Sequence, residues 1–471
     1  MQYRNGKAEE IKIAYVGGGS RGWAWKLMSE LARAEDIGGE VRLYDIDFGA
    51  AEANAVIGGL YSKAGEAKSC FRYRACRSAA EAMTGADFVI VSILPGSFEE
   101  MESDVHTPEA YGIYQSVGDT TGPGGIVRAM RTVPMMQEIA EAVKSFCPKA
   151  WVINYTNPMS LCVRTLYETF PEIRAFGCCH EVFGTQKLLA SAVEELCGIE
   201  GITRQEIKVE VTGVNHFTFL IRGQYRDLDL FPLYRRFAER YAESGFTKKL
   251  DPDWRSNPFR CNHRVKMDLF LRFGAIAAAD DRHLAEFCPG DWYLASPERA
   301  AQWGFSLTPV SWRKQDLQNR LAKSRRLLSG EEKPEIKSTG EEGVRQIRAL
   351  LGLGDFVTNV NLPNRGQVPD LPLGAVVETN ASFRDNSVTP VLAGAMPEGV
   401  RALVERIVSV QEDTVKGAIL RDPNRVLRGF LHDPLVEGRT DRGEELFEKM
   451  VENTKGYLGD YSCLSLRGER V

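Results

Sequence analysis

The chain has 471 residues, of which 43% are hydrophobic and 26% charged, and its formal net charge is −5. These values are ordinary for a globular protein of two or three domains. The weak charge, with no long run of one sign, argues against nucleic acid or an anionic membrane as a partner. We expect no signal peptide, because the first residues lack an apolar stretch with a cleavage site. No stretch is apolar enough for a membrane helix, and the ten cysteines lack disulfide-framework spacing. We therefore expect a cytoplasmic protein with reduced thiols.

Strands and helices alternate along the first part of the chain. Apolar runs predict the strands, and apolar residues at helical spacing predict the helices between them. The strands are expected at Ile11–Val16, Val41–Tyr44, Ala86–Leu94 and Ala150–Asn154, and the helices at Trp23–Ala34, Ala50–Ser62 and near Val133–Phe146. This alternation is typical of a parallel, doubly wound α/β sheet.

A glycine-rich turn follows the first predicted strand. Gly17, Gly19 and Gly22 form the pattern G-x-G-x-x-G, with Ser20 inside it, and a predicted helix starts directly afterwards. In this context the glycines allow a tight turn and a close approach of a dinucleotide's pyrophosphate to the helix N-terminus. Asp45 ends the second predicted strand and is the expected partner of the ribose hydroxyls, which favours NAD over NADP. The alternative for Asp45 is an ordinary turn residue.

The rest of the chain contains more helices than strands. A strand is expected at Ile207–Val214, and Val357–Thr379 combines β-forming residues with Pro and Gly turns. Helices are expected at Gly184–Leu196, Leu230–Ala242, Arg313–Leu328, Gly343–Leu351 and Gly399–Leu420. We predict an N-terminal Rossmann-type NAD-binding domain over residues 1–195, of the kind found in lactate and malate dehydrogenases. A C-terminal α+β domain over residues 196–471 is expected to bind substrate and metal.

Cysteine and histidine residues cluster where the two parts meet. Gly177-Cys178-Cys179-His180 is followed by Asn215-His216. A thiolate and an imidazole suit a borderline divalent metal, so Cys179 and His216 are candidate ligands. The alternatives are a core thiol for either cysteine and a structural role for His216.

Polar segments supply candidates for substrate contacts. Asp119 lies in the glycine-rich segment Val117–Arg128, which we expect to be a loop, and Asn157 follows a strand end. Turn chemistry explains both residues equally well. The segment Asp280–Glu286 holds five ionisable groups, which fits either a solvated loop or a base beside an anion-binding arginine.

With these residues in view, the chain resembles the glycoside hydrolases of family 4 from its first strand to about Pro434. The shared signature is a cysteine and its next residue after a Rossmann-type half, followed by Asn-His. The motif Cys-His-Glu-Val at Cys179–Val182 differs from the Cys-Asp or Cys-Asn of the phospho-sugar members, which argues against a phosphorylated substrate. Stretches such as SILPGS, INYTNPMS and DRHLAEF look like the α-galacturonidase branch.

The resemblance implies a redox-neutral cleavage that departs from the two-carboxylate pattern of most glycosidases. NAD takes a hydride from C3 of the sugar, a base removes the C2 proton, and the glycosidic bond breaks by elimination. Water then adds and the hydride returns. A divalent metal, expected to be Mn2+, acts as a Lewis acid on the C2 and C3 oxygens.

The resemblance also implies roles for individual residues. Cys179 and His216 match the metal ligands, and His180 matches the acid that assists the leaving group. Asp119 and Asn157 match contacts to sugar hydroxyls. For the base we choose Asp281, with Asp280 and His283 as alternatives.

We therefore expect an NAD- and metal-dependent glycosidase that cleaves α-galacturonides from pectin-derived oligosaccharides, as a homodimer or homotetramer. The C6 carboxylate calls for an arginine, whose planar fork matches it, and Arg282 and Arg365 are the candidates. Either arginine is alternatively a solvated surface charge. The alternatives for the whole chain are a neutral α-glucosidase or α-galactosidase of the same family, a 2-hydroxy-acid NAD dehydrogenase, and an NAD-binding sensor without turnover.

Overall fold

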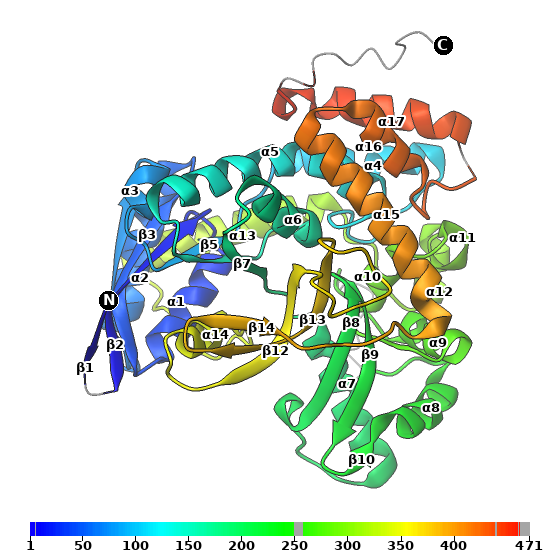
Figure 1. Cartoon of the computed structure of the whole chain (residues 1–471), viewed down its shortest axis with the longest axis horizontal. Helices are drawn as coiled ribbons and strands as arrows, with labels where there is room; N and C mark the ends of the chain where they lie inside the picture. Colours follow the sequence, from blue (N-terminus) through cyan, green and yellow to red (C-terminus); the bar gives the residue numbers. More distant parts are fainter. Residues whose placement is uncertain (5, 249–257, 439, 460, 462–471) are drawn as a thin grey trace.

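A ten-stranded sheet runs through the computed structural model, which describes residues 1–471 except 5, 249–257, 439, 460 and 462–471 (Figure 1). Its six parallel strands lie in the order β4-β3-β2-β5-β6-β7, the doubly wound order of a Rossmann sheet. They are β2 (Lys7–Val16), β3 (Ile37–Tyr44), β4 (Phe71–Cys76), β5 (Phe88–Val91), β6 (Trp151–Asn154) and β7 (Arg174–Gly177). β1 (Gln2–Arg4) adds an antiparallel strand to β2. The predicted fold class is confirmed.

Helices cover both faces of the parallel sheet because its strands are apolar on both sides. In β2, Ile13 and Tyr15 belong to one hydrophobic cluster, whereas Ala14 and Val16 belong to another, since successive side chains of a strand point to opposite faces. The first cluster includes side chains of α1 (Trp23–Arg33) and α2 (Phe48–Lys63). The second includes side chains of α3 (Ala79–Met83), α5 (Gly122–Phe146) and α6 (Met159–Thr169).

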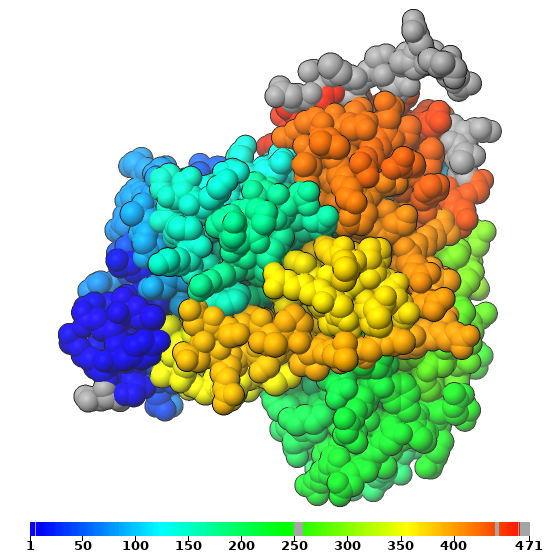
Figure 2. All heavy atoms as spheres, in the orientation of Figure 1, coloured from blue at the N-terminus to red at the C-terminus, as the bar shows by residue number. Residues whose placement is uncertain are grey.

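The last three strands of this sheet come from much later in the sequence. β12 (Phe356–Pro363) lies antiparallel to β7, with Asn361 opposite Gly177, and β13 (Val376–Arg384) and β14 (Ser387–Pro390) continue the sheet. A Cβ on Gly177 would lie 2.8 Å from Met159 Sδ and 2.9 Å from Asn361 Cβ, so a larger residue would force these side chains to shift. Figure 2 shows this yellow and orange segment between the blue N-terminal part and the green region. The sheet takes strands from both sides of residue 195, and the domain division there stays a prediction.

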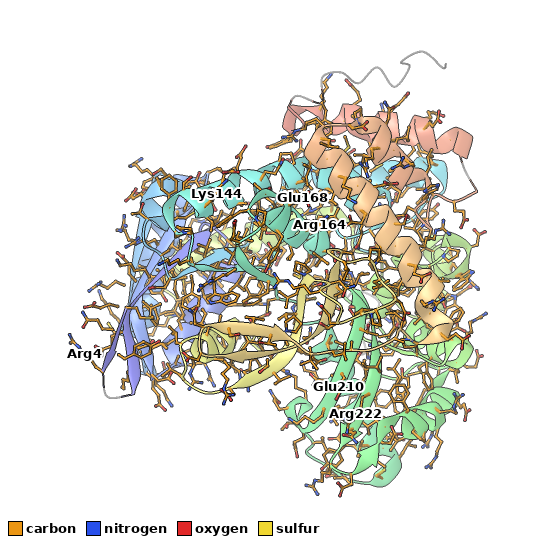
Figure 3. All side chains as sticks on the ribbon, in the orientation of Figure 1. Arg4, Lys144, Arg164, Glu168, Glu210 and Arg222 are labelled. Atoms are coloured by element: carbon orange, nitrogen blue, oxygen red, sulfur yellow. The ribbon has the colours of Figure 1, made fainter. Side chains whose placement is uncertain are left out.

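A second, four-stranded sheet carries a tight hairpin. β8 (Ile207–Val214) and β9 (Phe217–Tyr225) are antiparallel and are joined by Asn215-His216 alone. β10 (Leu228–Asp229) and β11 (Ile276–Ala277) also pair with β9. Glu210 and Arg222 face each other across the exposed side of the hairpin, with 3.3 Å between Oε1 and Nη1 (Figure 3). α7 (Glu181–Cys197), α8 (Leu230–Tyr241) and α9 (Arg264–Phe273) pack against apolar side chains of this sheet.

The remaining helices surround and connect the two sheets. α10 (Asp281–Glu286), α11 (Gly290–Tyr293) and α12 (Pro297–Gln302) follow β11. α13 (Val310–Ser329) returns to α2 and α4 (Phe98–His106), and α14 (Gly343–Leu350) packs on the first sheet. α15 (Glu398–Leu420), α16 (Pro423–Leu431) and α17 (Thr440–Thr454) form a group beside α4 and α5 (Figure 1). Within the described residues, no helix is long and apolar enough to cross a membrane.

The glycine-rich segment Val117–Arg128 is only partly the loop that its composition predicts. α5 begins at Gly122 and has Pro123 in its first turn, where a proline fits. A Cβ on Gly124 would lie 2.7 Å from the Asp104 carbonyl oxygen, and one on Gly125 would lie 2.5 Å from the Thr120 carbonyl carbon. The expectation was wrong from Gly122 onward because these glycines serve close packing against backbone, not flexibility.

Replacing Gly17 by alanine is expected to lower the free energy of unfolding more than the same change at Gly330. Both glycines have left-handed φ angles, 88° and 81°. At Gly17 the new Cβ would meet the Ser92 carbonyl oxygen at 2.0 Å, whereas Gly330 has open space. Gly330→Ala should cost about 1–2 kcal/mol from φ alone, and Gly17→Ala roughly 1–3 kcal/mol more. Urea unfolding measures both, and equal losses would contradict the packing argument.

Candidate functional site

The glycine turn after β2 is closed by the carboxylate at the end of β3. The Gly19 N–H donates to Asp45 Oδ2 at 2.8 Å. α1 starts after Gly22 without a side-chain cap from that residue, and Ser20 Oγ accepts from the Trp23 N–H at 3.2 Å. The turn therefore presents backbone N–H groups and a helix N-terminus, which together suit an anion such as a pyrophosphate.

Hydrogen bonds join the Asp119 loop to the tip of the β8–β9 hairpin. Thr120 Oγ1 donates to Asp119 Oδ1 at 2.7 Å and lies 2.9 Å from His216 Nδ1. Because the hydroxyl proton is used on Asp119, Nδ1 of His216 must donate to Thr120, and Nε2 keeps a free lone pair. Asn157 Nδ2 donates to Asp119 Oδ2 at 3.3 Å. The loop, the β6 end and the hairpin thus meet at one carboxylate.

His216 is buried and has a backbone conformation that non-glycine residues rarely adopt. Its φ of 64° costs about 1–3 kcal/mol, which the surrounding structure must offset. Burial lowers the pKa of its imidazole to about 3, and the neighbouring His283 acts in the same direction. The ring is therefore neutral near pH 7 and can act as a metal ligand.

The N-terminus of α10 supplies further groups. Asp280 Oδ1 accepts from the Arg282 and His283 N–H groups at 3.1 and 3.2 Å, and its own N–H donates to Glu181 Oε2 at 2.9 Å. The His283 ring lies 3.8 Å from that of His216 between centroids. In the described part of the chain, Nδ1 of His283 is buried without a hydrogen-bond partner.

Two sets of possible metal ligands share His283. The donor atoms of Asp119, His216 and His283 lie within 4.8 Å of one another, as do those of Glu181, Asp280 and His283. Burial raises the pKa of the Asp119 carboxyl, but His283, Arg128 and His216 outweigh it and hold the pKa below its usual range. An ionised carboxylate beside two neutral imidazoles is a suitable site for a divalent cation.

Cys179 lies next to this region but belongs to none of the ligand sets found in the described residues. It follows β7 and is buried, and its thiol lies against Asn215, the residue before His216. Burial raises the pKa of the thiol well above its ordinary value, and the Glu378 and Glu181 carboxylates add to the effect. The Cys179 carbonyl accepts from Asn359 Nδ2 at 3.3 Å, which ties it to β12.

The structure does not bring Asp281 or Arg365 to these ligand sets. Both oxygens of Asp281 accept N–H groups at the start of α9, Oδ2 from Val265 at 3.1 Å and Oδ1 from Lys266 at 3.0 Å. Burial raises the pKa of the Asp281 carboxyl to about 6. Arg365 is exposed in the turn after β12, and among the described residues no hydrogen bond or ion pair of its side chain is found.

His180 and Arg282 lie beside the ligand sets. The His180 side chain is 47% exposed, and its Nδ1 lies 3.7 Å from Glu341 Oε1. The pKa of the His283 imidazole is lowered mainly by burial, and His180 is close enough to add to this effect. Arg282 is buried, and its Nη2 donates to the Ser116 carbonyl at 3.3 Å and to Thr308. Its Nε has no partner in the described part of the chain.

Three residues of this region were assigned no role from the sequence. Glu286 Oε1 accepts from the Val117 and Gly118 N–H groups at 2.7 and 2.9 Å and so fixes the Asp119 loop to α10. Glu286 belongs to the ionisable segment after β11, and Glu181 belongs to the Cys-His-Glu-Val motif. Each therefore lies in a segment that the sequence had already indicated as functional. Arg128 itself, whose Nε donates to the Asn157 carbonyl at 3.2 Å, gave no such indication, because only the early start of α5 places it there.

Comparison with known proteins identifies the class of protein. A model of the family 4 glycosyl hydrolases matches residues 12–195, and a model of the C-terminal domain of that family matches residues 211–436. The chain belongs to this family of glycosidases. Among its relatives, the α-galacturonidase of Thermoanaerobacterium saccharolyticum (strain DSM 8691 / JW/SL-YS485) is 59% identical over 97% of this chain and 98% of its own length.

Solved structures agree with this fold. The crystal structure of Bacillus subtilis lplD, described provisionally as a glucosidase, is 50% identical and superposes with a TM-score of 0.89, covering 94% of this chain and 100% of that one. The 6-phospho-β-glucosidase of Thermotoga maritima, solved with manganese, NAD+ and glucose-6-phosphate, has a TM-score of 0.75 at 20% identity. That match covers 95% of this chain and 99% of that one.

Glu286→Gln is expected to remove part of the pH dependence of stability. Burial raises the pKa of the Glu286 carboxyl from 4.5 to about 8, against the amides of Val117 and Gly118, which lower it. Between these two pKa values the folded chain holds one more proton than the unfolded chain. The stabilisation that comes from the protonated Glu286 is therefore complete below pH about 4.5 and is lost as the pH rises through about 8.

The loss amounts to at most ~1.4 kcal/mol per pH unit, and the variant should lack it while keeping an oxygen acceptor for the two amides. Urea unfolding of both proteins at a series of pH values between about 5 and 8 measures the slopes. Equal slopes would contradict the assignment.

Proposed function

We propose that this family 4 glycosidase is an α-galacturonidase that uses NAD and a divalent metal, Mn2+ by preference. The observation that carries the proposal is the 59% identity with an α-galacturonidase over 97% of the chain. The substrate we propose is an α-linked galacturonide at the end of a pectin-derived oligosaccharide.

The residues after β2 fit NAD. Gly17 lies so close to β5 that a Cβ would meet the Ser92 carbonyl oxygen, and this tight turn leaves backbone exposed to a ligand. Gly19, Ser20 and Gly22 would hold the pyrophosphate at the start of α1. Asp45 would exchange its bond with the Gly19 N–H for the ribose hydroxyls.

The donor set also fits a divalent cation. We propose Cys179 and His216 as its ligands, with Nε2 of His216 as the donor atom because Nδ1 is bonded to Thr120. The buried, unpartnered Nδ1 of His283 indicates that a partner is missing at this place. The raised pKa of the Cys179 thiol means that a cation must displace its proton on binding. The three-donor set of Asp119, His216 and His283 is the alternative.

When bound, NAD supplies a hydride acceptor for C3 of the sugar, and the cation supplies a Lewis acid for the C2 and C3 oxygens. The chain's own groups handle the protons. We propose Asp280 as the group that takes the C2 proton, since both oxygens of Asp281 are bonded to α9. Oδ1 of Asp280 accepts two backbone N–H groups, which leaves Oδ2 for the proton.

Two features support these assignments. Burial raises the pKa of Asp280, but His283 and Arg282 outweigh it and lower the pKa, so the carboxylate is ionised and able to accept a proton. His180, exposed beside the ligand sets, is the group we propose to protonate the leaving oxygen. Asn157 Oδ1 is buried and unpartnered in the described part of the chain, so it can accept a sugar hydroxyl beside Asp119.

Hydrolysis of p-nitrophenyl α-D-galacturonide should require both NAD and a divalent cation, with no net accumulation of NADH. The reason is that a hydride taken from C3 returns to the same carbon in each turnover. Release of p-nitrophenol and absorbance of NADH are followed together, with and without dialysis against a chelator. A dehydrogenase would accumulate NADH instead, and full activity of the stripped protein would exclude the proposed chemistry.

Cys179→Ser and His216→Ala should each lower turnover by more than about 100-fold, because each removes a metal ligand. NAD affinity, measured by calorimetry, should change little because the nucleotide residues lie after β2 and β3. Mn2+ affinity, measured by electron paramagnetic resonance, should fall in both variants. If Asp119→Asn and His283→Ala lose Mn2+ while Cys179→Ser retains it, the ligands are Asp119, His216 and His283 instead.

A further inference from the structure

The segment that leads into the first turn of α13 is fixed to the loop that carries Asp119. The Thr308 N–H donates to the Ser116 carbonyl at 3.1 Å, three residues before Asp119. The Thr308 hydroxyl accepts from Arg282, and Trp312 packs edge-on against Phe259 at 4.9 Å between ring centroids. The Arg282 guanidinium lies over the same Phe259 ring, with its Cζ 5.1 Å from the ring centroid. The beginning of α13 and Arg282 thus form one packed unit beside the proposed metal ligands.

Arg313 lies in this turn and is partly buried, yet it makes no hydrogen bond or ion pair among the residues that the structure describes. Three other basic residues of the same helix are paired: Lys314 bonds Glu102, Arg320 bonds Asp316 at 2.6 Å, and Arg326 lies 3.0 Å from Glu332. Burying a guanidinium without a partner is costly, so such a group is expected where an anion binds.

The charges around Arg313 point to the same place. Burial lowers the pKa of its guanidinium, and the Asp119 carboxylate is the strongest of the charges acting against this effect. Asp119 accepts hydrogen bonds from Thr120 and Asn157, and its charge acts on Arg313 without an ion pair between the two side chains in the described part of the chain. Arg282 repels Arg313, and its own Nε is buried without a partner within the described ranges. Two neighbouring guanidinium groups therefore have donors to spare for one shared anion.

We propose that Arg313 binds the C6 carboxylate of the substrate, with Nε of Arg282 as a second donor, and that it determines the preference for uronides. This inference rests on the proposed function. The reacting carbons C2 and C3 would lie at the Asp119–His216–His283 set, and C6 lies across the sugar ring from them. Arg282 is bonded to the loop that carries Asp119, and Arg313 follows a segment bonded to the same loop. Both arginines are therefore expected beside that ligand set, on the unreactive side of the sugar. A planar fork of donors matches a carboxylate better than an ammonium does.

The test compares Arg313→Gln and Arg313→Lys with the wild-type protein and with Arg326→Gln, a control on the same helix far from Asp119. For each protein, kcat/KM is measured for the p-nitrophenyl α-galacturonide and the neutral α-galactoside. Binding of free galacturonate and galactose to the protein loaded with NAD and Mn2+ is measured by calorimetry. Arg313→Gln should lose roughly 10- to 150-fold on the galacturonide, mostly in KM, and nothing on the galactoside. Arg313→Lys should lose less, and Arg326→Gln should match wild type.

Three results would overturn the inference. Equal losses on both substrates would make Arg313 a structural residue, and no loss on either would leave the carboxylate to another group. Wild-type protein that binds galacturonate no better than galactose would show that no carboxylate receptor exists. Absence of galacturonide cleavage by the wild type, with selective galacturonate binding that Arg313→Gln removes, would refute the proposed function while supporting the carboxylate receptor.

Discussion

The pairing of β12 with β7 is the contact on which the rest of the site depends. It is a narrow contact, with Asn361 opposite Gly177, and it attaches β12, β13 and β14, which come much later in the sequence, to the edge of the parallel sheet. From there, Asn359 reaches the Cys179 carbonyl and Glu378 reaches Thr218 of the hairpin, at 2.8 Å between Oε2 and Oγ1. Asn380 bonds the Val211 N–H and the Val209 carbonyl of β8. The two sheets are thereby held at a fixed distance, with the candidate ligands between them.

The carboxyl groups of this region have different protonation states because their neighbours differ. Asp119 lies near Arg128 and two histidines, and these groups hold its pKa low despite burial. Glu378 lies near Glu181 and mainly neutral groups, and burial raises its pKa to about 7. The hydroxyl of Thr218 donates to the Val214 carbonyl at 2.9 Å, so a protonated Glu378 can donate to Thr218 in turn. Negative charge is therefore concentrated at Asp119 and Asp280, where a cation and a reacting proton are proposed.

The acidic residues in and before α10 also hold neighbouring elements in place. Asp280 caps α10 and, through its N–H, bonds Glu181 at the start of α7, so the proposed base is held by two helix termini. Glu286, the last residue of α10, holds the Asp119 loop by accepting two of its backbone N–H groups. Asp281 holds the start of α9 in the same way, by accepting the N–H groups of Val265 and Lys266. The three acidic residues of this short segment thus bond different parts of the structure. Of the three, only Asp280 is proposed to contact the substrate.

Short-range patterns in the sequence determined much of this protein. The alternation of strands and helices, the glycine turn and Asp45 at the next strand end were sufficient to predict the doubly wound sheet, because each depends on neighbours within a few residues. The motif around Cys179 and the pair Asn215-His216 pointed to the candidate site for the same reason, and their roles as metal ligands stay a prediction. The start of α5 at Gly122 was not predictable, since those glycines serve contacts with the backbone of Asp104 and Thr120. The choice among Asp280, Asp281 and His283 also required the tertiary structure, because identical carboxyl groups one residue apart point to different helices. Arg313 lies about 190 residues from Asp119 in the chain, and only the folded contacts of α13 bring it to that loop. Sequence encodes local conformation and chemistry, whereas the pairing of distant charges depends on packing that no local pattern contains.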